Sequence, residues 1–128
     1  ELDKITSCIV MEGMARGGSP SFSCTFSVQT GIGSMGIVFY GTPAQKEKYL
    51  PKMMTGEWVS AYALTEPGAG SDALSGKTTA YLSEDGKHYI LNGDKQFISN
   101  GSWANVFTVL AQVDGDKFSG FIIDRDTE

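Results

Sequence analysis

The hydrophobic pattern of this chain changes at Gly56, and that change constrains the fold more than any other feature of the sequence. Before Gly56, apolar residues such as Ile5, Ile9, Phe22 and Phe26 recur at helical spacing, as on one face of an amphipathic helix. After it, short runs rich in aromatic and β-branched residues are separated by turn residues, which is typical of strands. The sequence therefore predicts an α+β chain in which helices precede an antiparallel, β-barrel-like sheet.

Breaking and capping residues divide the first part into helices. Residues 17–20, Gly-Gly-Ser-Pro, interrupt the helical periodicity and separate two helices. A third helix is predicted after Thr42, because its hydroxyl can cap a helix, Pro43 suits the first helical position and Gln45 completes a capping box. We expect this helix to end at Pro51, which lacks a backbone donor.

Strands are expected throughout the second part, separated by turn sequences such as Glu-Asp-Gly, Asn-Gly and Asp-Gly-Asp. They are predicted at residues 58–64, 77–83, 87–91, 96–99, 105–113 and 117–123. The last strand would leave an uncovered sheet edge near the end of the sequence. We therefore expect the sequence to be a piece of a longer protein.

Charge and composition exclude several classes of function. Ten lysines and arginines stand against fifteen aspartates and glutamates, which gives a net charge of -5, and no basic cluster is present. Nucleic acid is therefore an unsuitable partner. We see no apolar run of the length of a membrane span and no secretion signal, so we expect neither a membrane span nor secretion.

The cysteines and the single histidine do not suggest a metal or nucleophile site. Cys8 and Cys24 lie in apolar surroundings without CxxC spacing or a nearby histidine, so we expect buried free thiols and no metal. His88 lies in a strand-like stretch far from either cysteine, and a catalytic triad would depend on this one poorly placed residue.

Residues 31–36 match the GxGxxG pattern, and Glu57 lies about twenty residues further on, as in dinucleotide-binding folds. That pattern requires a strand before it and a long crossover helix after it. Here helical periodicity precedes it, and residues 41–43 break the chain soon afterwards. We expect close packing of a helix against another helix or a ligand instead.

A more specific signal is YALTEPGAGSD at residues 62–72, where a predicted strand runs into a loop of small residues. Gly68 and Gly70 allow the main chain to approach a ligand closely, and successive N–H groups with the Ser71 hydroxyl suit a phosphate or diphosphate. A plain glycine-rich turn has the same spacing, and spacing alone favours it.

Residues 63–72, ALTEPGAGSD, look like the first signature of the acyl-CoA dehydrogenases. Residues 41–57 resemble the segment of that family before its β domain, and residues 91–101, LNGDKQFISNG, resemble its next flavin-contacting loop. The similarity covers essentially the whole chain in the family's order. It implies that residues 1–56 end an N-terminal helical domain and that residues 57–128 form most of a middle β domain.

The resemblance also implies an activity, a cofactor and partners. Members of this family hold FAD and acyl-CoA between three domains, usually in a homotetramer, and desaturate the α,β bond of a fatty acyl-CoA in β-oxidation. Electrons then pass to an electron-transfer flavoprotein. We expect such an enzyme, cytoplasmic in a bacterium or in the mitochondrial matrix of a eukaryote. The alternatives are an acyl-CoA oxidase and a non-catalytic β domain that binds an acyl group or a nucleotide.

Cofactor-binding residues follow from the resemblance, position by position. They are expected at the end of the first strand, in the glycine-rich loop and in the later loop: Tyr62, Leu64, Thr65, Gly70, Ser71, Phe97, Ile98 and Ser99. Thr65 would bind the pyrimidine edge of the flavin, and Gly70 and Ser71 would serve the FAD diphosphate. Phe97 stands where the family usually has Trp, and Ser99 where it commonly has Thr, so an aromatic face and a hydroxyl are retained.

Substrate-binding residues are expected to be Ser71, Thr30 and Gly33. By resemblance the helix around Gly33 forms the floor of the acyl cavity, and glycine there favours a medium-to-long straight acyl chain. Tight helix packing explains the glycine nearly as well. In the family the base that removes the substrate α-proton is a Glu of the C-terminal domain, so we expect no catalytic residue in this chain and a structural role for Glu66.

Overall fold

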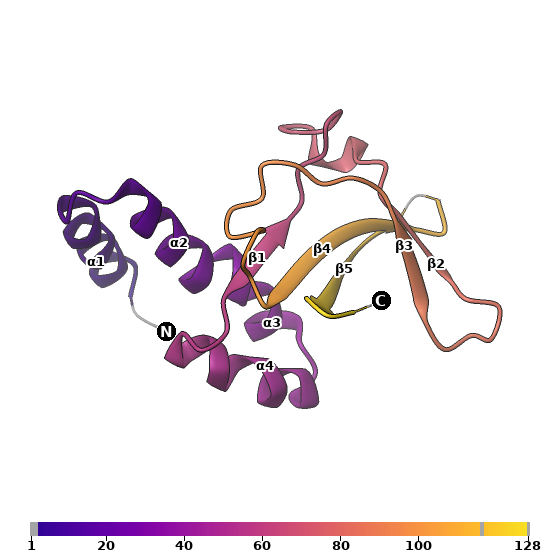
Figure 1. Cartoon of the computed structure of the whole chain (residues 1–128), viewed down its shortest axis with the longest axis horizontal. Helices are drawn as coiled ribbons and strands as arrows, with labels where there is room; N and C mark the ends of the chain where they lie inside the picture. Colours follow the sequence, from indigo (N-terminus) through magenta and orange to yellow (C-terminus); the bar gives the residue numbers. More distant parts are fainter. Residues whose placement is uncertain (1–2, 116, 128) are drawn as a thin grey trace.

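The computed structural model describes residues 3–115 and 117–127. It contains the helices α1 (Lys4–Arg16), α2 (Pro20–Thr30), α3 (Ile32–Tyr40) and α4 (Pro43–Thr55), followed by the strands β1 (Ser60–Ala63), β2 (Thr79–Leu82), β3 (Tyr89–Asn92), β4 (Val106–Val113) and β5 (Lys117–Asp124). A short 3-10 helix, η1 (Ala73–Ser75), lies between β1 and β2. Helices therefore precede a sheet, as predicted, and the two parts lie side by side in Figure 1. Asp116, expected in the last turn, lies outside the described residues.

Side-chain caps fix the starts of three helices. Asp3 caps α1 and Ser19 caps α2, each through a side-chain oxygen that accepts a backbone N–H bond. At α4 the predicted capping box is present, because the Thr42 hydroxyl accepts from the Gln45 N–H while the Gln45 side chain accepts from the Thr42 N–H. These bonds satisfy donors that a helix start otherwise leaves free.

The predicted end of α4 at Pro51 is wrong, because the helix continues beyond it. The buried side chains of Tyr49 and Met53 hold the helix against the core on both sides of the proline. Gly56 ends the helix instead, in a left-handed conformation with φ of 78° that glycine adopts readily. The stretch expected to be one second helix is divided into α2 and α3 at Gly31, whose φ of -113° and ψ of -115° are not helical.

The sheet is mixed and open, so the prediction that all strands pair antiparallel is wrong. The central strand β4 pairs parallel with β1 near its start and parallel with β2 near its end. β5 pairs antiparallel with β4 along all eight residues, and β2 forms an antiparallel hairpin with β3. Because β5 occupies one edge of β4 throughout, β1 and β2 share the other edge in succession.

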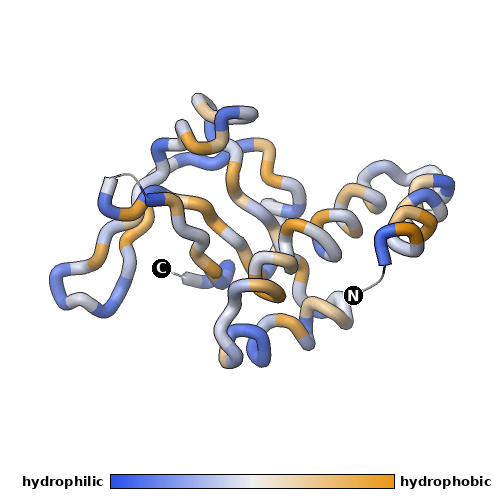
Figure 2. The backbone as a smooth tube through the Cα atoms, turned by 180° about the vertical axis from the view of Figure 1, so that it is seen from behind, coloured by the Kyte–Doolittle hydropathy of each residue, from blue (hydrophilic) through white to orange (hydrophobic). Residues whose placement is uncertain are grey.

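The core lies between the sheet and the two helices α3 and α4. Its buried centre consists of Ile37, Tyr49, Met53 and Val106, and Leu50, Trp58 and Ile122 pack around it. Figure 2 shows apolar segments in the strands and in the helices beside them. Burial of apolar area drives this association, and it fixes α3 and α4 against β4.

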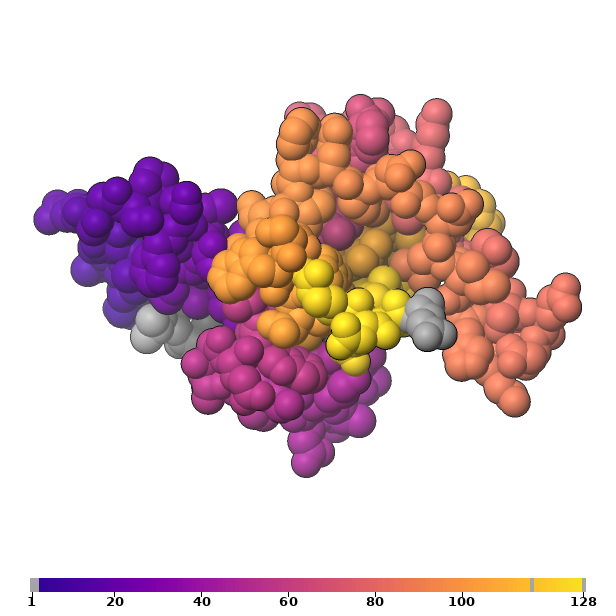
Figure 3. Space-filling view, in the orientation of Figure 1, coloured from indigo at the N-terminus to yellow at the C-terminus, as the bar shows by residue number. Residues whose placement is uncertain are grey.

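Apolar residues also lie on the surface of the described chain. Ile5 and Ile9 of α1 are 75% and 64% exposed, and Figure 3 shows the α1–α2 part and the β2–β3 hairpin projecting from opposite sides of the molecule. Both cysteines are exposed in this structure, so the prediction of buried thiols is wrong. They lie on α1 and α2, which cover less of the sheet than α3 does.

Residues Pro20–Tyr40, which form α2 and α3, are long and apolar enough by length and composition to cross a membrane, so the expectation that no apolar run reaches this length is wrong. In the structure this stretch is interrupted at Gly31 and contacts α1, α4, β1 and β4. A mostly buried core helix passes the same test of length and composition, and so does a helix that is 17% buried, as this stretch is. Length and composition alone are therefore weak evidence for a span.

Candidate functional site

Two loops meet at the carboxyl end of β1. Lys95 Nζ donates to the Leu64 carbonyl at 3.1 Å, and the Gln96 N–H donates to the Thr65 carbonyl at 3.0 Å. The Gln96 side chain donates further to the Glu66 carbonyl at 3.3 Å. In Figure 1 the loop from β3 to β4 passes beside the end of β1. The structure therefore brings Leu64 and Thr65 together with the loop that contains Phe97, Ile98 and Ser99.

Residues 96–99 are not the strand that the sequence predicts. Phe97 has a φ of 55° and Asn100 a φ of 66°, and neither value is compatible with a strand. Phe97 is 88% exposed, so its aromatic ring gains little from burial. Its positive φ is also unusual for a bulky residue. Such a strained, exposed aromatic residue is typical of a ligand site.

The glycine-rich loop after β1 starts with a tight turn. The N–H of Glu66 donates to the Ala69 carbonyl at 3.0 Å, and the N–H of Ala69 donates to the Glu66 carbonyl at 3.1 Å. Beyond the turn, no hydrogen bond between described residues uses the N–H of Gly70 or Ser71. A Cβ atom at Gly70 would meet nothing within 4 Å. Free donors beside open space are suited to an anion such as a phosphate.

Glu66 is the most strongly bonded charged residue of the site. Its carboxylate is 6% exposed and accepts from Lys95 Nζ at 2.7 Å, from the Thr78 N–H at 3.0 Å and from the Lys77 N–H. Burial raises the pKa of Glu66, but the bonds from Lys95, Thr78 and Lys77 together outweigh it and lower the pKa to about 2. Glu66 is therefore ionised at neutral pH and ties three segments together, which supports its predicted structural role.

Tyr62 and Ser71 lie at the two ends of this region. Tyr62 is half-buried in β1, opposite Thr108 in the parallel register with β4. Ser71 is exposed, next to the free N–H groups of the glycine-rich loop. Ser99 is also exposed, and its hydroxyl lies 3.5 Å from the thiol of Cys24 on α2. Hydroxyl groups are thus available in both loops.

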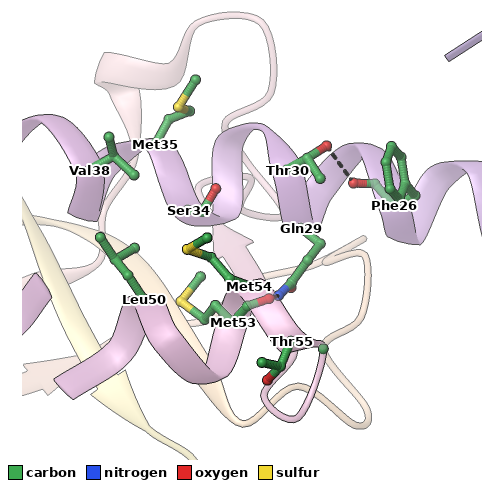
Figure 4. Close-up of a pocket in the computed structure, with 11 residues that line it drawn as sticks. Phe26, Gln29, Thr30, Ser34, Met35, Val38, Leu50, Met53, Met54 and Thr55 are labelled. Atoms are coloured by element: carbon green, nitrogen blue, oxygen red, sulfur yellow. Dashed lines mark hydrogen bonds between the residues drawn. The ribbon is translucent and has the colours of Figure 1, made fainter. Parts of the chain in front are cut away.

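Thr30 lies away from the two loops, in the wall of an apolar cleft between α2–α3 and α4. The cleft has a volume of about 590 Å³ and is lined by Phe26, Gln29, Thr30, Ser34, Met35, Val38, Leu50, Met53, Met54, Thr55 and Gly56. Figure 4 shows the lining residues on the helices on either side of it, with the Thr30 hydroxyl bonded to the Phe26 carbonyl at 2.8 Å. The cleft offers an apolar surface and few free polar groups.

Gly33 does not line this cleft. A Cβ atom at this position would lie 2.3 Å from Ser60 Oγ and 2.8 Å from the Val28 carbonyl oxygen. The glycine therefore permits the close approach of α3 to β1. Close packing of α3 on β1 is thus sufficient to explain the glycine, and substrate binding by Gly33 stays a prediction.

Three polar residues that position the site were missed at the sequence level. Gln29 donates to the carbonyls of Met53 and Trp58 at 2.8 and 2.9 Å, and its Oε1 accepts from both the N–H and the hydroxyl of Ser60. Lys95 and Asn100 make comparable bonds to distant segments. The only local signal was Gln29 itself, a polar side chain among the apolar positions of a helix.

Comparisons with known proteins cover nearly all of the chain. Residues 1–57 match the family model for the acyl-CoA dehydrogenase N-terminal domain, and residues 61–128 match the model for the middle domain. A probable acyl-CoA dehydrogenase of Bacillus subtilis (strain 168) is 55% identical over 125 residues, which are 98% of this chain and 21% of the relative. The human mitochondrial very long-chain specific acyl-CoA dehydrogenase is 46% identical over 110 residues, or 79% of this chain and 17% of the relative.

Among solved structures, the acyl-CoA dehydrogenase of Bacillus anthracis complexed with FAD matches with a TM-score of 0.91 and 51% sequence identity. That match covers 98% of this chain and 21% of the other. The chain thus spans about a fifth of the length of these relatives.

Proposed function

Because the chain belongs to the acyl-CoA dehydrogenase family, we propose that it forms one wall of an FAD site in a longer enzyme that desaturates the α,β bond of an acyl-CoA thioester. One observation carries this proposal: the end of β1, with Leu64 and Thr65, is bonded to a loop that holds Phe97 exposed and strained. Similarity to an FAD complex supports the choice of cofactor.

The chemistry of the residues fits FAD. The free N–H groups of Gly70 and Ser71 suit its diphosphate, and the exposed Phe97 ring offers an aromatic face to the flavin. The Thr65 and Ser99 hydroxyls are donors for the polar edges of the ring system. Bound there, FAD would supply the acceptor for the substrate hydride.

This chain's own part in the reaction is to bind and orient. A hydroxyl donor fixed at the pyrimidine edge, as proposed for Thr65, stabilises negative charge that develops there and so raises the electron affinity of the ring. Glu66 is bonded on both carboxylate oxygens and has a low pKa, so it is not suited to removing a proton. We assign the proton-abstracting base to a part of the enzyme outside this chain.

The proposed substrate is a medium-to-long straight-chain fatty acyl-CoA. Similarity to the very long-chain specific enzyme supports it, and the apolar cleft beside Thr30 provides a surface of suitable chemistry. We propose further that residues 1–56 and 57–128 belong to separate domains, that electrons pass to an electron-transfer flavoprotein, and that the full-length enzyme is a homotetramer. Its proposed location is the cytoplasm of a bacterium or the mitochondrial matrix of a eukaryote.

The test uses the full-length protein, purified with its flavin and mixed anaerobically with saturated acyl-CoA thioesters of increasing chain length. We expect the visible flavin absorption to bleach and one enoyl-CoA to form per flavin reduced, fastest with longer chains. FAD that no acyl-CoA reduces would contradict the proposal. Reoxidation of the product complex by oxygen would then separate an oxidase, in which it is fast, from a dehydrogenase.

A further inference from the structure

Asn100 ends the loop that contains Phe97 and Ser99, and it is held from several sides. Its backbone is left-handed, with a φ of 66°, and the residue is 8% exposed. Asparagine tolerates this conformation better than most residues. Its carbonyl accepts bonds from the N–H groups of Trp103 and Ala104 at 3.0 and 2.7 Å. The backbone at the end of the loop is therefore fixed locally.

The side chain of Asn100 joins two segments that are far apart in the sequence. Its Nδ2 donates to the Ser60 carbonyl in β1 at 3.0 Å, and its Oδ1 accepts from the Thr25 hydroxyl in α2 at 3.0 Å. The amide thus uses a donor toward the sheet and an acceptor toward the helix. Because these groups are largely buried, loss of either partner leaves a polar group unsatisfied.

The neighbouring residues make a second contact in parallel with the first. Cys24, which precedes Thr25 on α2, has its sulfur 3.5 Å from the hydroxyl of Ser99, which precedes Asn100 in the loop. Two consecutive residues of α2 therefore contact two consecutive residues of the loop. A displacement of α2 relative to the sheet would move Ser99 and, with it, the strained Phe97.

We propose that Asn100 is a positioning residue of the flavin site, which holds the Ser99 hydroxyl and the Phe97 ring in place by bonding to Thr25 and Ser60. This inference rests on the proposed function. Asn100 itself need not touch the flavin, since its side chain is engaged by α2 and β1. Its effect is transmitted through the two loop residues.

The variants Asn100→Gly and Thr25→Val separate the side-chain bonds from the backbone conformation. Glycine keeps the left-handed backbone and removes both side-chain bonds, whereas valine removes only the Thr25 donor at nearly constant volume. Asp114→Gly is the matched control, because Asp114 also has a positive φ, of 53°, and lies exposed in the turn between β4 and β5.

The experiment measures FAD content, thermal stability, the flavin absorption spectrum, kcat and KM of each variant of the full-length holoenzyme. We expect Asn100→Gly to retain FAD, to shift the flavin spectrum and to lower kcat about tenfold while KM changes less than about twofold, since misplaced groups slow the chemical step. Thr25→Val should shift the flavin spectrum and lower kcat in the same direction, by a smaller factor. The double variant should be no worse than Asn100→Gly alone, because both substitutions break one network.

The inference would be overturned if Asn100→Gly or Thr25→Val had the same flavin spectrum and kcat as the control Asp114→Gly. It would also be overturned if the loss of kcat only followed the loss of thermal stability. Should Asn100→Gly fail to fold, Thr25→Val decides by the same readouts. A wild-type enzyme that binds no FAD would refute the proposed function. A flavin-loaded wild type with unaffected variants would refute only this inference.

Discussion

Replacing Glu66 by glutamine removes a buried charge and leaves the shape of the side chain nearly unchanged. In the folded protein this carboxylate accepts from the N–H groups of Lys77 and Thr78 and from the Lys95 ammonium. Glutamine can retain only part of this set, because its amide nitrogen is a donor. Lys95, whose side chain is 12% exposed, would lose its anionic partner.

The size of the effect follows from the pKa of Glu66, which falls from an ordinary value of 4.5 to about 2 on folding. At about 1.4 kcal/mol per pH unit, this difference corresponds to about 3 kcal/mol at neutral pH. Between pH 4.5 and about 2 the unfolded segment binds more protons than the folded one. The stabilisation of the folded state by ionised Glu66 is therefore complete above this window and is lost as the pH falls through it. At pH 3 less than about half of it remains.

Hydrogen exchange of the backbone amides measures this contribution locally in the full-length protein. The segment from Glu66 to Thr78 should exchange at least about 100-fold faster in Glu66→Gln than in the wild type at neutral pH, after correction for intrinsic rates. The control Glu57→Gln makes the same change in an exposed pair, 3.6 Å from Lys52, and should leave exchange unaltered.

Two results would refute this reasoning about Glu66. One is exchange in Glu66→Gln within a factor of about two of the wild type at neutral pH. The other is a difference between the two proteins that stays constant when the pH is lowered from 7 to about 3.

Three further predictions concern the packing and the flavin edge. Gly33→Ala should lower the free energy of unfolding, measured by denaturation, by about 1–3 kcal/mol, because the new Cβ would collide with Ser60. The control Gly36→Ala should cause no such loss, because its Cβ would meet its nearest atom at 3.9 Å. Gln29→Leu should cost at least about 2 kcal/mol in the same assay, since it leaves backbone groups at the junction of helices and sheet unsatisfied; a smaller loss would contradict the role of these bonds. Thr65→Val should lower the flavin reduction potential by the equivalent of about 1.5–3 kcal/mol per bond lost, and an unchanged potential in a potentiometric titration would exclude the proposed contact.

A local signal predicted the start of α4. The capping box of Thr42 and Gln45 is complete within the residues that form it, so it could be identified from the sequence. The strand runs and the antiparallel hairpin of β2 and β3 are also local features. The parallel pairing of β1 with β4 is not, because Ser60 and Val106 are brought together by a long connection that no periodicity describes.

The error at residues 96–99 has a similar cause. Their composition favours a strand, but Lys95 and Gln96 bond to the end of β1 and Asn100 bonds to α2 and β1, and these distant contacts impose positive φ values that end any strand. The motifs singled out the two loops that the structure brings together at the end of β1. The residues that hold those loops in place became visible only in the folded structure.

A crystal structure of the full-length protein with FAD bound is the most direct test of the central claim. We predict that the Thr65 hydroxyl lies within hydrogen-bonding distance of the pyrimidine edge, that the Phe97 ring packs on the flavin and loses most of its exposure, and that the N–H groups of Gly70 and Ser71 face the diphosphate. FAD bound elsewhere, with Phe97 still exposed to solvent and the Thr65 hydroxyl distant from the ring, would contradict the claim.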